Sequence, residues 1–196
     1  MSELYIGLLH YPVLNRAGQT VASALTGLDL TDIARSARTY GVRRYDVITP
    51  VRSQREIAER LLRFWLQEKP DLTYRREALQ RVAIVATLED SLRDVLAEEG
   101  LKPLLVGTSA RGLQGTKISY QALRARLEAD REPVYIVFGT GWGLAEAVRE
   151  QFDYLLPPLW GPDDYNHLSV RAAAAIVLDR LRSRSPEEGA EASEGS

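Results

Sequence analysis

The sequence predicts an α/β protein with a mostly parallel sheet of six strands and helices on both faces. Short runs rich in Val, Ile and Leu alternate with segments of helical period along the chain. The runs are continuously apolar, which is typical of strands that are buried on both sides. With 196 residues, the chain can bury an ordinary single core without disulfides or metals.

The apolar runs mark the strands, and the segments between them mark the helices. The predicted strands are 4–11, 45–51, 82–87, 103–109, 134–140 and 154–160. The predicted helices are 30–41, 53–67, 88–100, 119–129, 143–152 and 165–182.

Local signals define three of these helices. Gly41 is expected to close the first, while Thr87 and Gly100 are expected to cap the third at its two ends. The second opens with a Ser-x-x-Glu capping box. Its residues are Ser53 and Glu56, and the face expected to be buried consists of Ile57, Leu61 and Trp65.

One domain, 1–182, is expected to contain all of these elements. The remaining segment, 183–196, is acidic, contains Gly, Ser and Pro, and has no apolar residue beyond Ala. Such a composition cannot bury enough apolar surface to order the chain, so we expect a disordered tail.

The composition excludes several kinds of chemistry. The absence of Cys rules out disulfides, thiolate catalysis and Cys-ligated zinc. His10 and His167 are the only imidazoles, too few for a typical catalytic zinc site, so we expect no metal. No segment approaches the roughly 20 apolar residues of a membrane span. We therefore expect a cytoplasmic protein with no membrane contact.

Positive charge is concentrated in one stretch although the formal net charge is −2. Residues 35–81 contain eleven Arg and one Lys against six acidic residues. This stretch is either a solvated helical surface or a face for RNA, and the sequence favours neither.

Three loops follow strands and are unusual in composition. They are 106–116, with three glycines, 138–143, and the proline-rich and aromatic 155–170. In an open parallel sheet ligands bind at the carboxyl ends of the strands, so these loops are the candidate binding site.

Two of the loops allow other interpretations. The glycines of 138–143 are spaced G-x-G-x-G, whereas the dinucleotide fingerprint requires G-x-G-x-x-G, so a nicotinamide site is weakly supported and a simple tight turn is an alternative. The apolar run 155–160 would be costly in water and is expected to be buried or to line a pocket of adenine size. The alanines 172–175 that follow allow close helix contact or merely favour a helix.

Four segments resemble a known family, the SPOUT methyltransferases. They are HYPVLN at 10–15, LDLTDIARSARTYGV at 28–42, FGTGWGL at 138–144 and YNHLSVRAAAAIVLDRL at 165–181. The sequence is similar to the small bacterial members of this class over nearly its full length. The resemblance implies a C-terminal trefoil knot, S-adenosylmethionine as the cofactor, RNA (tRNA or rRNA) as the partner, and a homodimer formed through the knot helices.

The resemblance also implies which residues hold the methyl donor. They come from the three loops and are Thr108, Gly139, Gly141, Trp142, Gly143, Pro157, Leu159, Gly161, Asn166, His167 and Leu168.

For catalysis, Arg35 corresponds to the catalytic arginine of the ribose 2'-O-methyltransferases of the class. Asp32 and Asp163 are candidate acceptors for the proton of the RNA, and the alternative for Arg35 and Asp32 is a surface ion pair. Asp29 and His167 both replace asparagines of those relatives. A base nitrogen is therefore as plausible an acceptor as a ribose oxygen.

Two other functions compete with an RNA methyltransferase. A protein could keep the donor pocket without turnover and act as an RNA-binding or assembly factor. A dinucleotide-dependent oxidoreductase is the weaker alternative.

Overall fold

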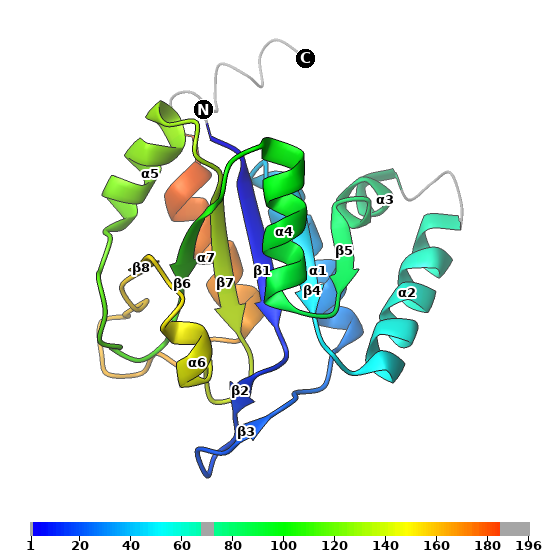
Figure 1. Cartoon of the computed structure of the whole chain (residues 1–196), viewed down its shortest axis with the longest axis horizontal. Coiled ribbons are helices and arrows are strands. Elements are labelled where there is room, and N and C mark those ends of the chain that lie inside the picture. The colour runs from blue at the N-terminus through cyan, green and yellow to red at the C-terminus, as the bar shows by residue number, and fades with distance from the viewer. Residues whose placement is uncertain (1, 68–72, 185–196) are drawn as a thin grey trace.

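The computed structural model describes residues 2–67 and 73–184. Six strands form one sheet in the order β5-β4-β1-β7-β6-β8, and all of their pairings are parallel (Figure 1). The predicted six-stranded parallel sheet is confirmed. The strands are β1 Leu4–Leu9, β4 Arg44–Ile48, β5 Val82–Val85, β6 Leu104–Gly107, β7 Val134–Gly139 and β8 Tyr154–Leu155.

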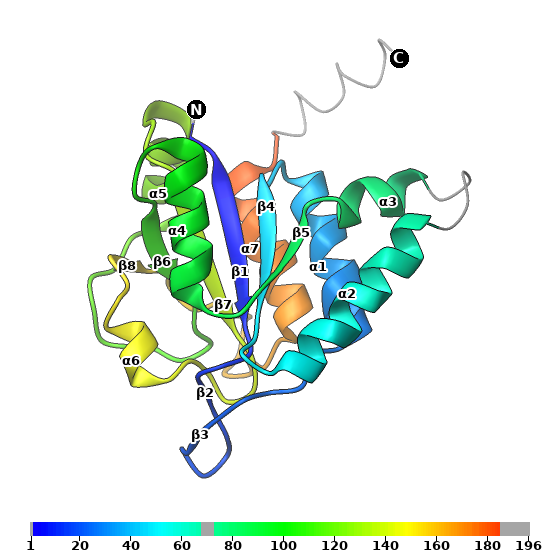
Figure 2. The same cartoon turned by 45° about the vertical axis from the view of Figure 1, so that its right-hand side comes forward.

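Alternation along β1 divides the core into two layers. Leu4, Ile6 and Leu8 belong to one buried cluster, whereas Tyr5 and Leu9 belong to a second. Successive strand residues point to opposite faces, so each cluster is a layer between the sheet and its helices. Helices therefore cover both faces, as predicted (Figure 2). Those of the first layer are α1 Gly27–Thr39, α2 Arg52–Gln67, α3 Thr73–Leu79, α5 Tyr120–Ala129 and α7 Val170–Arg182; those of the second are α4 Leu88–Glu99 and α6 Glu146–Arg149.

Three of the predicted helix ends are confirmed. Thr87 accepts a hydrogen bond from the amide of Asp90 at the start of α4, and Gly100 ends that helix with a left-handed φ of 71°. Gly41, with φ 68°, follows α1 one residue after its C-cap Tyr40. Glycine adopts this conformation without a Cβ clash, which explains why both helices stop there.

The predicted capping box of α2 is wrong. The helix begins at Arg52, so Ser53 lies inside it, and Glu56 accepts a hydrogen bond from Arg52 instead of capping the backbone. The predicted buried face is also shifted. Ile57 is 58% exposed, and Ala58 and Leu62 are buried in its place.

The elements around the last strand are shorter than predicted. The helix expected over 143–152 is reduced to α6, and the strand expected over 154–160 to the two residues of β8. Gly143 has a φ of 109°, which does not belong to a helix, and the two prolines after β8 have no N–H for a ladder. The last helix begins at Val170 instead of residue 165, because Ser169 caps its first turn. The short hairpin β2 Val13–Leu14 and β3 Thr20–Val21, and helix α3, were not predicted.

Strand β8 lies between the beginning and the end of the loop 107–118 and is hydrogen-bonded to both. On one side it pairs with β6, and Leu156 N donates to Gly107 O at 3.0 Å. On the other side Leu155 N donates to Thr116 O at 2.8 Å, and Ile118 N donates to Leu155 O at 3.1 Å. This enclosure is the local arrangement that a C-terminal knot requires, and the knot itself stays a prediction.

The end of α7 also marks the end of the described chain. Ser183 O accepts a hydrogen bond of 2.9 Å from Arg124 of α5. Apart from Ser183 and Arg184, the predicted disordered tail lies outside the described residues.

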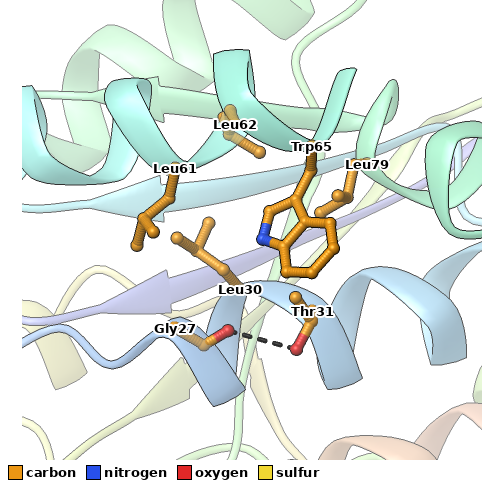
Figure 3. A pocket seen from close by; sticks show the side chains of 7 residues that line it. All are labelled: Gly27, Leu30, Thr31, Leu61, Leu62, Trp65 and Leu79. Carbon is orange, nitrogen blue, oxygen red and sulfur yellow. Dashed lines mark hydrogen bonds between the residues drawn. The ribbon is translucent and has the colours of Figure 1, made fainter. Parts of the chain in front are cut away.

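A small hollow separates α1, α2 and α3 (Figure 3). Its volume of about 10 Å³ is close to that of a single water probe, so it is a packing gap and not a ligand site. The side chains around it are mainly apolar, and Thr31 donates to Gly27 O at 3.1 Å within α1. The lining residues are Gly27, Leu30, Thr31, Leu61, Leu62, Trp65 and Leu79.

Candidate functional site

A cavity of about 600 Å³ opens at the carboxyl edge of the sheet. This is the lower edge in Figure 1, toward which the strand arrows point. Residues from the loops after β1, β6, β7 and β8 line the cavity, together with the first turns of α1 and α7. All three of the predicted loops therefore meet there. The volume lies in the ordinary range of pockets for nucleotide-sized ligands.

The loop after β7 is hydrogen-bonded to β2 and to Pro12, the residue before β2. Trp142 N donates to Leu14 O at 3.0 Å, Leu14 N donates to Gly143 O at 2.8 Å, and Ala145 N donates to Pro12 O at 3.2 Å. Gly141 has a φ of 61°, and a Cβ built there would lie 3.0 Å from Leu14 O. Only glycine suits this position, because the backbone is left-handed and the opposing carbonyl is close. The loop is therefore a rigid wall of the cavity.

A chain of hydrogen bonds links this loop to the end of β1. His10 Nδ1 lies 2.9 Å from Ser23 Oγ, which in turn contacts Thr140 Oγ1. Thr140 Oγ1 donates to Leu9 O at 3.2 Å, and Ser23 Oγ donates to His10 O at 3.4 Å. Nε2 of His10 is buried without a hydrogen-bond partner. Burial lowers the pKa of His10, and the negative charge of Asp29 partly opposes this shift.

Asp29 is the buried carboxylate of the cavity wall. Thr26, the N-cap of α1, donates to its Oδ2 at 2.6 Å, and Arg171 of α7 donates to its Oδ1 at 2.8 Å. Arg171 also lies 3.5 Å from Asp32, so a single guanidinium joins two carboxylates of α1. Asp29 is thus fixed in position by two hydrogen-bond donors, a hydroxyl and a guanidinium, which suit a carboxylate anion.

The loop after β8 closes the remaining side. Asn166 donates from its amide to Ala110 O, which links this loop to the one after β6. Tyr120 of α5 donates to Pro157 O at 3.2 Å. His167 and Tyr165 pack edge to face, with ring centroids 5.5 Å apart. These contacts hold the loop over the cavity without a regular strand or helix.

The predicted donor-binding residues gather around one space. All of them except Gly161 line the cavity. The apolar part of the lining comes from side chains such as Phe138, Leu113 and Leu159, and the polar part from backbone and a few side chains. A wall of this kind suits the predicted donor, since a flat apolar slot with exposed backbone groups accepts an adenine ring.

Unlike the predicted donor-binding residues, the predicted catalytic residues do not lie around the cavity. Arg35, Asp32 and Asp163 are exposed, and none of the three lines the cavity. Asp32 contacts Arg171, and Asp163 accepts a hydrogen bond of 3.0 Å from the amide of Tyr165. Arg35 has no side-chain partner among the described residues.

The sequence analysis gave no role in this site to three of its residues. The buried histidine His10, the carboxylate Asp29 and the arginine Arg149 of α6 all lie in or beside the cavity wall. Asp29 was visible as a departure from related sequences. Arg149 lies in a helical pattern that is also typical of surface charges, so its sequence carries no signal.

Residues 2–67 and 73–184 contain neither a membrane-spanning helix nor a metal-binding cluster. No helix in these ranges is long and apolar enough to cross a membrane. These ranges also contain no group of three or more His, Asp or Glu residues that could hold a metal ion.

Comparisons with known proteins agree with the predicted family. A family model described as SAM-dependent RNA methyltransferase matches residues 3–183. An uncharacterized protein of Aquifex aeolicus is 42% identical over 185 residues, which covers 93% of this chain and 89% of that protein.

A tRNA (guanine-N(1)-)-methyltransferase of Nitratidesulfovibrio vulgaris is 44% identical over 184 residues. The match covers 91% of this chain but only 42% of the relative, so the chain spans less than half of that longer protein.

Among solved structures, the SpoU methyltransferase AviRb of Streptomyces viridochromogenes, in complex with the cofactor AdoMet, superposes with a TM-score of 0.55. The superposition covers 92% of this chain and 58% of that one at 16% identity, so this likeness shows a shared SPOUT fold. The family match favours a methyltransferase over both a non-catalytic factor and an oxidoreductase. The chain belongs to the SAM-dependent RNA methyltransferase family and shares its fold with the SpoU methyltransferase AviRb.

Proposed function

We propose that this protein methylates RNA inside the cavity at the carboxyl edge of its sheet, and that Asp29 lies beside the RNA atom that receives the methyl group. The observation that carries the proposal is the meeting of three loops from separate strands around one space of about 600 Å³. The family supplies the cofactor and the type of acceptor.

We propose that the donor lies against the three loops, with Gly139, Gly141 and Gly143 on one side and Pro157 and Leu159 on the other. The donor provides a methyl group on a positively charged sulfur, which an acceptor atom displaces in line. Much of the acceleration of methyl transfer then comes from holding the donor and the acceptor atom close together and correctly oriented. The hydrogen bonds that fasten the loop after β7 to Leu14 support this role, because they make the wall rigid before anything binds.

For the proton of the acceptor we propose Asp29 as the first candidate. It lines the cavity, and its carboxylate is held by two donors, whereas Asp32 and Asp163 lie outside the lining. A carboxylate fixed beside the acceptor can take its proton as the methyl group is transferred. Arg35, exposed on α1 without a described partner, is proposed to bind an RNA phosphate near the entrance.

We further propose a homodimer that works in the cytoplasm, where RNA and donor are both found. Large apolar side chains are exposed where α1 and α7 begin, with Leu28 at 59% and Leu168 at 45%. Such side chains next to a cavity are typical of a contact surface. Multi-angle light scattering is the measurement: a monomer at micromolar concentration would contradict this part of the proposal.

The function is tested with methyl-labelled donor and separate pools of tRNA and rRNA, followed by mass spectrometry of the nucleosides. We expect label in one RNA pool and a single methylated nucleoside. The product decides between a ribose oxygen and a base nitrogen such as guanine N1. Donor binding without labelling of either pool would support the non-catalytic alternative instead.

A further inference from the structure

Arg149 is an arginine of the cavity wall that has no partner. It lies at the end of α6, lines the cavity, and its Nε is buried without a hydrogen bond. Its guanidinium makes no ion pair or aromatic contact with any residue in the described part of the chain.

Every other half-buried arginine in the described ranges has such a partner. Arg44 pairs with Asp46 at 2.7 Å, and Arg171 pairs with Asp29 at 2.8 Å. Arg55 donates to Thr49 O at 2.9 Å. The remaining ones contact a backbone carbonyl, a carboxylate or an aromatic ring; they are Arg75, Arg81, Arg124, Arg126 and Arg182. Burying a polar atom without a hydrogen-bond partner is unfavourable, so the buried Nε of Arg149, on a side chain with no ion pair or other polar contact, needs an explanation.

The cavity offers no anion of its own for Arg149. Asp29 is the acidic residue of the lining, and it is already paired with Arg171. Arg111, another cation of the lining, is exposed to solvent and lies over the ring of Trp142 at 5.9 Å. The anion must therefore arrive with the molecule that fills the cavity.

The position of Arg149 suggests which end of that molecule it meets. Helix α6 packs through Val148 on the second core layer, whereas α1, which holds Asp29, packs on the first. Arg149 and Asp29 thus approach the cavity from opposite faces of the sheet. If the acceptor RNA reaches Asp29, the group at Arg149 belongs to the far end of the donor.

We propose that Arg149 binds the carboxylate of the donor's methionine moiety and so selects ligands that carry it. A guanidinium and a carboxylate match in charge and geometry, with two parallel N–H···O bonds. The inference rests on the proposed function, because it assumes that the cavity holds the donor. A phosphate of the acceptor RNA has the same recognition chemistry and is the outcome that the experiment must separate.

The experiment is calorimetric titration with S-adenosylmethionine and with its decarboxylated analogue, which differs only in the missing carboxylate. The variants are Arg149→Gln, Arg149→Lys and the matched control Arg131→Gln, an exposed arginine that precedes β7 and therefore lies at the opposite end of that strand from the cavity. We expect the unaltered protein to prefer the carboxylated ligand by about tenfold or more, as for a hydrogen-bonded charge pair. Arg149→Gln should bind both ligands equally, Arg149→Lys should recover part of the preference, and Arg131→Gln should keep all of it.

Three outcomes would overturn the proposal. In the first, Arg149→Gln weakens both ligands by the same factor, which indicates a structural role. In the second, affinity for both ligands is unchanged. In the third, only RNA affinity falls, which assigns the anion to a phosphate. If the unaltered protein binds neither ligand, the proposed function itself fails, and this result is distinct from the other three. A thermal melt of the unliganded variants serves as the folding control, and Arg149→Gln should melt close to the unaltered protein, because it loses no hydrogen bond or ion pair of the described residues.

Discussion

Arg171 donates a hydrogen bond of 2.8 Å to Asp29, although 142 residues separate them in the chain. The bond joins the first turn of α7 to the first turn of α1 at the wall of the cavity. The carboxylate that we propose as the proton acceptor is therefore held in place by the last helix of the fold. Helices α1 and α7 must therefore both be in place before the site is complete.

Replacing Asp29 by Asn should abolish most of the methyl transfer while leaving donor binding intact. The amide keeps the size of the side chain but cannot take a proton, and a positioned base contributes about 10²–10⁴-fold to a rate. We expect a fall of at least about 100-fold in the single-turnover rate with labelled donor. Donor affinity, measured by calorimetry, should change less than threefold, or about 0.7 kcal/mol.

Asp32→Asn and Asp163→Asn are the matched controls for this prediction. Both residues are exposed and lie outside the lining, so their variants should retain most of the activity. If one of these variants loses activity while Asp29→Asn keeps it, the proton acceptor is that residue and our assignment is wrong.

Replacing Arg171 by Met should lower stability as well as activity. The variant leaves Asp29 buried without its cation, and removing one partner of a buried pair is costly. The side chain of Arg171 is 32% exposed, so water compensates in part. We expect a loss of about 1–2 kcal/mol in the free energy of unfolding, measured with urea. The double variant with Asp29→Asn should lose less than the sum of the two single losses, because the unpaired charge is gone.

Replacing Gly141 by Ala should weaken donor binding through the backbone. The left-handed φ of 61° costs about 1–2 kcal/mol for a residue with a Cβ, and that Cβ would press on Leu14 O at 3.0 Å. Leu14 belongs to β2, which is hydrogen-bonded to this loop. Gly18 is the control, since its φ is 78° but nothing lies within 4 Å of a built Cβ.

We expect both variants to lose stability from the backbone conformation, Gly141→Ala to lose more because its Cβ also presses on Leu14 O, and only Gly141→Ala to lose affinity for the donor. Urea unfolding and calorimetric titration measure the two quantities. Equal donor affinity in both variants would mean that the loop after β7 tolerates displacement and does not shape the donor site.

The sequence predicted the fold well where local patterns determine it. The strands β1, β4 and β7 are long apolar runs, and α4 has both of its caps written in the sequence as Thr87 and Gly100. The prediction failed around β8, where the backbone follows contacts with distant segments. Residue 155 is hydrogen-bonded to the loop 107–118 rather than to a sequence neighbour, and no local pattern reports this.

The site shows the same division. Its three loops were predicted because alternating strands and helices place them at one edge of the sheet. The roles of individual charges were not, because they depend on pairing across the fold. Asp29 and Asp32 lie three residues apart on α1, yet only Asp29 lines the cavity. Arg149 and Arg171 both lie in helices. They differ in that Arg171 pairs with Asp29, whereas Arg149 forms no ion pair with any described residue.

Acid should destabilise the folded protein through His10. Burial lowers the pKa of this side chain, so the folded state stays neutral at a pH where the unfolded chain already binds a proton. The unfolded state then binds more protons, and stability falls as the pH falls. The stabilisation is complete above the ordinary histidine pKa of about 6.5 and is lost progressively as the pH decreases below it.

Urea unfolding between pH 5 and pH 7.5 measures this effect in the unaltered protein, in His10→Asn and in His167→Gln. Asparagine places an amide near the position of Nδ1, so it can still form a hydrogen bond with Ser23 but does not titrate. The stability difference between the unaltered protein and His10→Asn should therefore shrink as the pH falls, by at most about 1.4 kcal/mol per pH unit for one proton. His167→Gln is the control for the loss of an exposed histidine. A difference between the unaltered protein and His10→Asn that is constant across this range would show that His10 does not couple folding to protonation.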